Sequence, residues 1–267
     1  MSSGRFAVVL LDEELAVPVR ELAAPLAKAI RMVRYDALNA LKLNRYIPFR
    51  DLEAGAASAA VECLAGLGVK AVAVDADLLP PESRVFTVHN ADALEGGLDV
   101  QTDLAGRMRT LEWADIEVVS AATVNETSTA HGFDGGAIHQ QIRDARMAAA
   151  SMGHGMLGAS AMVQPDFKPK SRTDVYQVLC VMPREVEIDV RFRADQFNYD
   201  YLADRRRTNS AENFQLLAGD VISRTEGALV HGPARGLAES GALPPTTNKQ
   251  GLARMNRWLR LRAREGL

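Results

Sequence analysis

Apolar and polar positions alternate in the middle of the chain, in the stretch RMRTLEWADIEVVSAATV at residues 107–124, around which the rest of the chain is organised. A polar turn leads into alternating residues, which are followed by Trp113, Ile116, Val118 and Val119. Alternation of this kind is typical of strands that are buried on one side. We therefore expect two adjacent strands that meet at a tight corner, with Trp113 and Ile116 directed inward.

The chain begins with a continuous apolar run, FAVVLL at Phe6–Leu11, which predicts a buried strand. Apolar residues then recur at spacings of three and four, as they do on one face of a helix. Proline is best tolerated in the first turn of a helix, where its missing N–H has no partner to lose. Pro25 therefore predicts a helix that starts near Glu21 or Leu22 and ends near Met32.

Four further elements are predicted before residue 78. Asp36 is placed to cap a second helix, and Tyr46–Phe49 forms a short strand. Asp51 caps a third helix that Gly68 ends, since glycine favours the position after a helix. Val69–Val74 follows as a strand.

This order predicts an N-terminal α/β sandwich, a small sheet covered by helices, over residues 1–78. It resembles a ferredoxin-like unit. Neither glycine-rich phosphate-binding motif, GxGxxG or GxxxxGK[ST], is present. The stretch DLLPPESR carries Pro80–Pro81, which stops a strand and stiffens a connection. We therefore place a domain boundary there, with the second domain over residues 79–267.

The second domain is predicted to be β-rich. From Val85 the pattern has a period of two and is broken by glycine turns, which favours an antiparallel meander. Val186 to Arg193 alternates apolar and charged residues, which predicts a strand with one buried and one solvated face. Ser210 is a candidate cap for a helix, and a last amphipathic helix carries Trp258. The predicted fold class is α+β.

Residues 127–174 interrupt this rhythm with a long glycine-rich insertion, in which residues 137–151 suit a helix. A structureless stretch of this length is usually functional or disordered. Imidazole and carboxylate groups together suit a divalent metal, although no HxH or HxxxH spacing fixes two of them on one face. A mobile polar loop explains them as well. The metal-ligating candidates are His131, Asp134, His139 and His154.

The second domain resembles the pleckstrin-homology-like domains of bacteria. The residues that carry the resemblance are LDVQTDLAGRMRTLEWADIEVV with its W-x-x-I, then FNYDYL and the downstream NF. The resemblance covers about residues 85–224, with the insertion inside it. It implies a protein that binds lipids or proteins and is not an enzyme.

Other reactive residues have simple structural interpretations. No GxSxG motif marks a nucleophile. The carboxylates of Glu185, Glu187 and Asp189 share one strand face, an arrangement suited to acid–base chemistry. A solvated outer face explains them as well, because Arg191 and Arg193 continue it. His231 lies in a Gly/Pro loop without a recognisable partner. The cysteines, Cys63 and Cys180, lie in apolar runs and predict buried thiols in a reducing compartment.

Two basic clusters are candidates for contact with anions or with a membrane. A basic amphipathic helix can lie on an anionic bilayer, and this makes peripheral membrane association an alternative function. The simpler interpretation is an exposed helix whose arginines bond to acidic groups of the same protein. The candidate contact residues are Arg205, Arg206, Arg207, Arg257, Trp258 and Arg260.

Composition narrows the function classes. The formal net charge is −3, so no overall basic field attracts nucleic acid. No apolar stretch approaches the roughly 20 residues that span a bilayer, and no secretion signal is recognisable. We therefore expect a bacterial cytoplasmic protein without integral membrane insertion and without a cofactor.

The leading hypothesis is non-enzymatic binding or scaffolding with an unknown protein partner, and self-association is left open. A metal-dependent enzyme built on the insertion is the rival.

Overall fold

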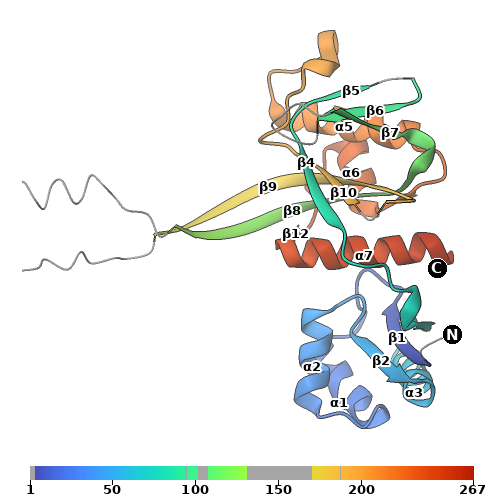
Figure 1. The fold of residues 1–267 in the computed structure, drawn as a ribbon. Coiled ribbons are helices and arrows are strands. Elements are labelled where there is room, and N and C mark those ends of the chain that lie inside the picture. Colours follow the sequence, from blue (N-terminus) through green and yellow to red (C-terminus); the bar gives the residue numbers. More distant parts are fainter. Residues whose placement is uncertain (1–3, 94, 102–107, 131–169, 187) are drawn as a thin grey trace, which may run out of the picture. The chain divides into compact units, whose positions relative to one another are not determined.

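The computed structural model describes residues 4–93, 95–101, 108–130, 170–186 and 188–267. The chain divides into two compact units, one formed by residues 1–125 with 175–267 and the other by residues 126–174. Helices combine with antiparallel and mixed sheets (Figure 1), so the predicted α+β class is confirmed.

The first layer of the larger unit is a three-stranded antiparallel sheet with the order β2–β1–β3. Its central strand is buried on both sides, which is why its sequence is a continuous apolar run. Val8 and Leu10 face a core with Leu22, Leu26 and Leu64 from the covering helices. The elements are β1 (Arg5–Leu10), α1 (Val19–Ala29), α2 (Arg34–Leu43), β2 (Phe49–Glu53), α3 (Ala54–Gly66) and β3 (Ala71–Asp75).

The first helix departs from the prediction. It begins at Val19, and Pro25 lies inside it rather than in its first turn. The ring removes one backbone hydrogen bond. Full burial of Leu22 and Leu26 on the same helix offsets this loss, because burial of a leucine contributes about 1.5–3 kcal/mol.

The two predicted aspartate caps are also wrong. Val33 precedes α2, and Asp36 lies inside its first turn, where a carboxylate still complements the helix dipole. Asp51 lies within β2 with a φ of 64°, and Glu53 precedes α3. Gly68 lies just after the end of α3 with a φ of 76°, as its sequence position predicted.

The second sheet is mixed. Its order is β11–β8–β9–β10–β4, and β12 also pairs with β8. β10 is antiparallel to β9 but parallel to β4, with Arg191 opposite Thr87. The second domain is therefore not purely antiparallel. The strands are β4 (Arg84–Val88), β8 (Ile116–Ala130), β9 (Lys170–Pro183), β10 (Ile188–Arg193), β11 (Leu229–Val230) and β12 (Thr246–Thr247).

The predicted meander is confirmed for β5 (Ala91–Ala93), β6 (Gly97–Gln101) and β7 (Met108–Glu112), which form a separate antiparallel sheet. Its expected first strand at Val85 is β4, which pairs in parallel with β10 instead. A single 3-10 turn, Trp113–Asp115, joins it to β8. Trp113 and Ile116 are buried as expected. The corner, however, connects two different sheets rather than two paired strands.

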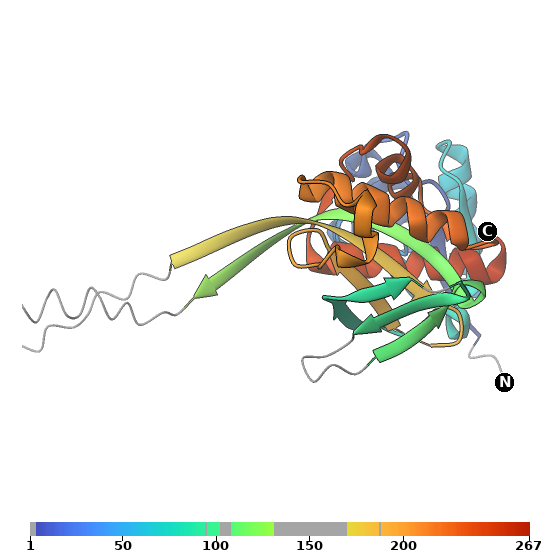
Figure 2. The same ribbon diagram turned by 90° about the horizontal axis from the view of Figure 1, so that it is seen from above.

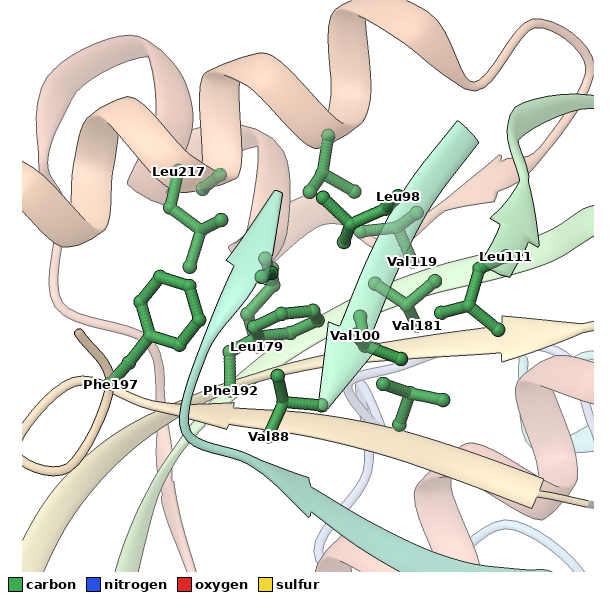
Figure 3. Packing of buried hydrophobic residues seen from close by; sticks show 14 of the residues in the cluster. Val88, Leu98, Val100, Leu111, Val119, Leu179, Val181, Phe192, Phe197 and Leu217 are labelled. Atoms are coloured by element: carbon green, nitrogen blue, oxygen red, sulfur yellow. The ribbon is translucent and has the colours of Figure 1, made fainter. Parts of the chain in front are cut away.

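One face of the mixed sheet packs against α5 (Ser210–Arg224), α6 (Gly232–Ser240) and the meander (Figure 2). Val119, Leu179, Val181 and Phe192 point into this core. Figure 3 shows Val119 and Val181 beside Leu98 and Leu111 of the meander. The helix cap lies one residue before the predicted Ser210, because Asn209 accepts a hydrogen bond from the Ala211 N–H. A short 3-10 segment, Asp200–Arg205, precedes α5.

The opposite face of the mixed sheet is covered by α7 (Lys249–Glu265). Trp258 of this helix shares one core with Val9 and Val74 of the first sheet and with Val118 and Tyr176 of the second. In Figure 1, α7 accordingly lies between the two sheets. Residues on both sides of position 78 thus share a core, and independent folding of residues 1–78 stays a prediction.

The helix α7 corrects the interpretation of β10. Its charged face was expected to be solvated, yet Asp189 is only 2% exposed and Arg191 only 11% in its side chain. The alternation of apolar and charged residues is real, but α7 covers the second face at Asp189. Asp189 and Arg191 are therefore part of a packed interface, whereas Glu185 is exposed and Glu187 lies outside the described residues.

The smaller unit contributes the ends of β8 and β9 to the described residues. The hydroxyls of Thr127 and Thr173 lie 3.3 Å apart. The helix predicted over residues 137–151 lies outside the described residues.

Candidate functional site

A cavity of about 330 Å³ lies in the larger unit beside the amino end of α7. Its walls come from the loop after β1, the end of α2, the start of α6 and the first turns of α7. This volume is at the lower end of the range for small-molecule sites. The residues that give it chemical character are Glu13, Lys42, Arg45, Tyr46, His231 and Arg254.

His231 is fixed at the base of this cavity by backbone pairing. Strand β11 runs parallel to β8, and the His231 N–H donates to the Val119 carbonyl at 2.9 Å. The next residues begin α6, with Pro233 in the first turn. The imidazole is therefore held by a strand on one side and a helix on the other, and the residue is 5% exposed.

The imidazole pairs with a carboxylate from the first loop of the chain. His231 Nε2 lies 3.3 Å from Glu13 Oε2, and burial lowers the pKa of His231 despite the opposing effect of Glu13. Near pH 7 the ring is thus neutral, with its proton on Nε2 facing Glu13. Nδ1 is then a buried acceptor, and it has no hydrogen-bond partner.

Three cations line the cavity, and two of them are anchored by main-chain oxygens. Arg45 donates to the Glu13 carbonyl at 2.6 Å, which also fixes the loop that carries the Glu13 carboxylate. Arg254 donates to the carbonyl of Leu43. Because carbonyl oxygens carry no full charge, neither contact neutralises the guanidinium. The cavity therefore presents Lys42, Arg45 and Arg254 together with the carboxylates of Glu13 and Glu14.

The first turn of α7 closes the cavity. Asn248 caps this helix by accepting a hydrogen bond from the Gly251 N–H at 2.7 Å. A Cβ at Gly251 would overlap the hydroxyl of Thr247, so glycine allows β12 to approach the helix. The amino end of a helix carries partial positive charge, which adds to that of Arg254.

Tyr46 forms a wall that connects the cavity to the core. Its ring stacks on Trp258, with centroids 4.7 Å apart. Burial raises the pKa of its hydroxyl, while Arg45 acts in the opposite direction. The hydroxyl therefore stays protonated at neutral pH and is available as a donor. The site thus combines a neutral imidazole acceptor, a phenol donor and fixed charges of both signs.

The predicted metal ligands His131, Asp134, His139 and His154 lie outside the described residues, and their role stays a prediction. Within the part of the chain that the structure describes, no group of three His, Cys, Asp or Glu side chains is arranged to hold a metal ion.

The prediction that Trp258 and Arg260 contact a membrane or an anion is wrong, because both side chains are fully buried. Arg260 donates to the carbonyls of Pro183 and Ile188, each at 2.8 Å. Arg257, on the same helix, is half-buried. Among the arginines of α7, Arg260 is thus internal, whereas Arg264 is exposed.

The other basic cluster is exposed but partly neutralised. Arg205 makes a bidentate ion pair with Asp220 at 2.7 and 2.8 Å, and Arg206 pairs with Asp200. The backbone N–H of Arg207 donates a hydrogen bond to Oδ1 of Asn213. Contact of these arginines with an external anion would compete with these pairs, and it stays a prediction.

Sequence reasoning missed the pair of His231 and Glu13. The two residues come from opposite ends of the chain, and neither lies in a recognised motif. The sequence did contain one local signal. His231 directly precedes Gly-Pro, and a helix that starts at these residues fixes the backbone of the histidine. Its partner could be identified only from the way α6 packs beside the first loop.

No helix among the described residues is both long and apolar enough to cross a membrane. Comparisons of the chain with protein-family models, with curated proteins and with solved structures found no match.

Proposed function

We propose that this protein is a non-enzymatic binding protein, and that the cavity beside α7 binds a small molecule with charged groups of both signs. The observation that carries the proposal is the buried His231 imidazole, which is oriented by Glu13 and has an unused acceptor at Nδ1. A buried acceptor without a partner costs about 1–3 kcal/mol. A ligand that donates to it would recover this energy.

The charges around the cavity define the ligand class. Lys42, Arg45 and Arg254 favour an anionic group, whereas Glu13 and Glu14 favour a cationic or donor group. Amino acids and related zwitterions carry both groups on a short skeleton. Such a ligand fits a cavity of about 330 Å³.

The test is a binding screen of amino acids and hydroxy acids by isothermal titration calorimetry. The variant His231→Gln keeps a polar side chain but removes the imidazole. We expect at least about a tenfold loss of affinity, as for a lost hydrogen bond in a buried site. His89→Gln is the matched control, because His89 does not line the cavity. No binding by any screened compound, or equal affinity in both variants, contradicts the proposal.

General-base catalysis is a second candidate, because an imidazole oriented by a carboxylate is the arrangement of many catalytic bases. Nuclear magnetic resonance of the ligand during incubation with the protein separates the two. A non-enzymatic binding protein leaves the ligand unchanged. Turnover that disappears in His231→Gln and persists in His89→Gln assigns catalysis instead.

The resemblance to pleckstrin-homology-like domains and the expected protein partner remain part of the same proposal. A pull-down from a bacterial lysate, with His231→Gln as the comparison bait, shows whether a partner requires the intact cavity. Recovery of no partner under several salt conditions contradicts the scaffolding hypothesis and leaves small-molecule binding to the calorimetric test.

A further inference from the structure

A second cavity, of about 220 Å³, lies on the other side of the first turn of α7 and has a different electrostatic character. It is formed by the face of the mixed sheet that α7 covers. Its polar lining consists of Thr87, Tyr176, Arg191, Arg193 and Lys249. Among the described residues that line it, none is acidic.

Alternation along β10 brings the two arginines to this face. Ile188, Val190 and Phe192 point into the core under α5, so Arg191 and Arg193 point toward α7. Lys249 and Leu252 face them from the helix at a spacing of three residues, which places both on one side of α7. Strand and helix periodicity thus bring three cationic residues to one small cavity.

The partners of Arg191 are weak. Its NH2 group lies 3.4 Å from Asp189 Oδ2, an oxygen that also accepts from Asn256 at 3.0 Å. The other oxygen of Asp189 lies 3.6 Å from Arg260. One carboxylate is therefore shared by two arginines and an amide. The Nε of Arg191 is buried and has no hydrogen-bond partner.

Arg193, unlike Arg191, is held in a fixed orientation by neighbouring side chains. It forms a bidentate pair with Asp195 at 2.7 and 3.1 Å, and its guanidinium lies 3.6 Å from the centroid of the Tyr176 ring. The aromatic ring and the carboxylate fix its orientation. Asp195 offsets part of the charge of Arg193, but the guanidinium stays at the cavity in a rigid side chain, which lowers the entropy cost of binding.

We infer that this cavity is a binding site for a small oxyanion, a phosphate or a carboxylate group, held by Arg191 and Lys249 with Arg193 as a fixed neighbouring charge. An oxyanion would supply the acceptor that Arg191 Nε lacks and would lie near the amino end of α7, whose partial charge is positive. The volume of about 220 Å³ admits a phosphate with a short substituent. The inference is independent of ligand binding beside His231.

The test uses the full chain and isothermal titration calorimetry with inorganic phosphate or acetate, at an ionic strength held constant with sodium chloride. We expect saturable binding of at least one of the two anions. Arg191→Gln and Lys249→Gln are each expected to weaken it by about tenfold or more, as for a charge-assisted hydrogen bond. Arg235→Gln, which removes an exposed charge from α6, should leave the affinity unchanged.

If Arg191→Gln does not fold, Lys249→Gln still tests the inference, because Lys249 is exposed. His231→Gln should bind the anion normally, which separates this site from the larger cavity. Heats that do not saturate for either anion, or wild-type affinity in Lys249→Gln, overturn the inference. Preference for phosphate over acetate, or the reverse, identifies which oxyanion the site takes.

Discussion

Trp258 in the last helix donates its indole N–H to the backbone carbonyl of Leu10 in the first strand, at 2.6 Å. The indole is fully buried and stacks on Tyr46. The bond links the N-terminal sheet to the helix that also covers the mixed sheet. It is one of the contacts that hold α7, beside whose first turn both cavities lie.

Replacing Trp258 with Phe should lower the free energy of unfolding by about 2–4 kcal/mol, because it removes the bond to Leu10 and leaves a cavity. Urea denaturation measures the loss. Hydrogen exchange should also show faster exchange in residues 5–10. Trp113→Phe, in the other core, is the control and should leave exchange in β1 unchanged. Equal protection of β1 in both variants would contradict the assigned role.

Arg260 is fully buried close to Glu117 at 3.8 Å and Asp189 at 3.6 Å. Replacing Arg260 with a neutral residue would leave the buried carboxylates of Glu117 and Asp189 without its positive charge. We expect this to lower the free energy of unfolding by about 3–5 kcal/mol. Arg260→Lys should recover little of this, because an ammonium cannot bond to the same carbonyls in the same geometry. Chemical denaturation of Arg206→Ala provides the contrast. Its half-exposed pair with Asp200 should contribute less than about 1 kcal/mol.

The lowered pKa of His231 makes stability depend on pH in a defined direction. The unfolded chain binds a proton near pH 6.5, whereas the folded protein resists protonation because the imidazole is buried. The contribution of His231 is therefore complete above about pH 6.5 and falls as the pH drops below it. Urea midpoints between pH 7.5 and 5.5 should fall less in His231→Gln than in the wild type. An identical decline in both proteins would refute this linkage.

Gly97 and Gly96 are adjacent but should respond differently to alanine. A Cβ at Gly97 would lie 2.6 Å from the Leu111 carbonyl in the paired strand β7, and backbone cannot move aside easily. A Cβ at Gly96 meets nothing within 4 Å. Gly97→Ala should therefore destabilise the protein by about 1–3 kcal/mol, as overpacking does, while Gly96→Ala serves as the control. Thermal melting measures both.

The two cysteines should differ in reactivity. Both are free thiols; Cys63 is half-buried, whereas Cys180 is fully buried and burial raises its pKa to about 11. Since only the thiolate reacts, Cys180 should resist a thiol reagent at pH 8 until the protein is unfolded in urea. Mass spectrometry of the labelled native protein identifies the modified residue. Labelling of Cys180 at the rate of Cys63 would show that the core opens readily.

Local sequence patterns identified most of the elements. The apolar run at Phe6–Leu11 predicted β1, the glycine turns and alternation around Leu98 and Leu111 predicted the meander, and Trp113 with Ile116 predicted a buried corner. Helix ends were less accurate, as Pro25 and Asp51 show. Burial of neighbouring leucines compensated an interior proline, and a left-handed backbone at Asp51 replaced the expected cap.

The sequence by itself determined which residues alternate, which segments are apolar and that helices and strands combine in one α+β protein. Only the tertiary structure decided which polar faces are covered. Placement of α7 between two sheets buried Asp189 and Arg260 and brought Arg191 and Arg193 to a cavity. Packing of α6 beside the first loop likewise brought His231 to Glu13. Periodicity reports the two sides of a strand or helix, but the partner on each side depends on long-range packing, which no local pattern encodes.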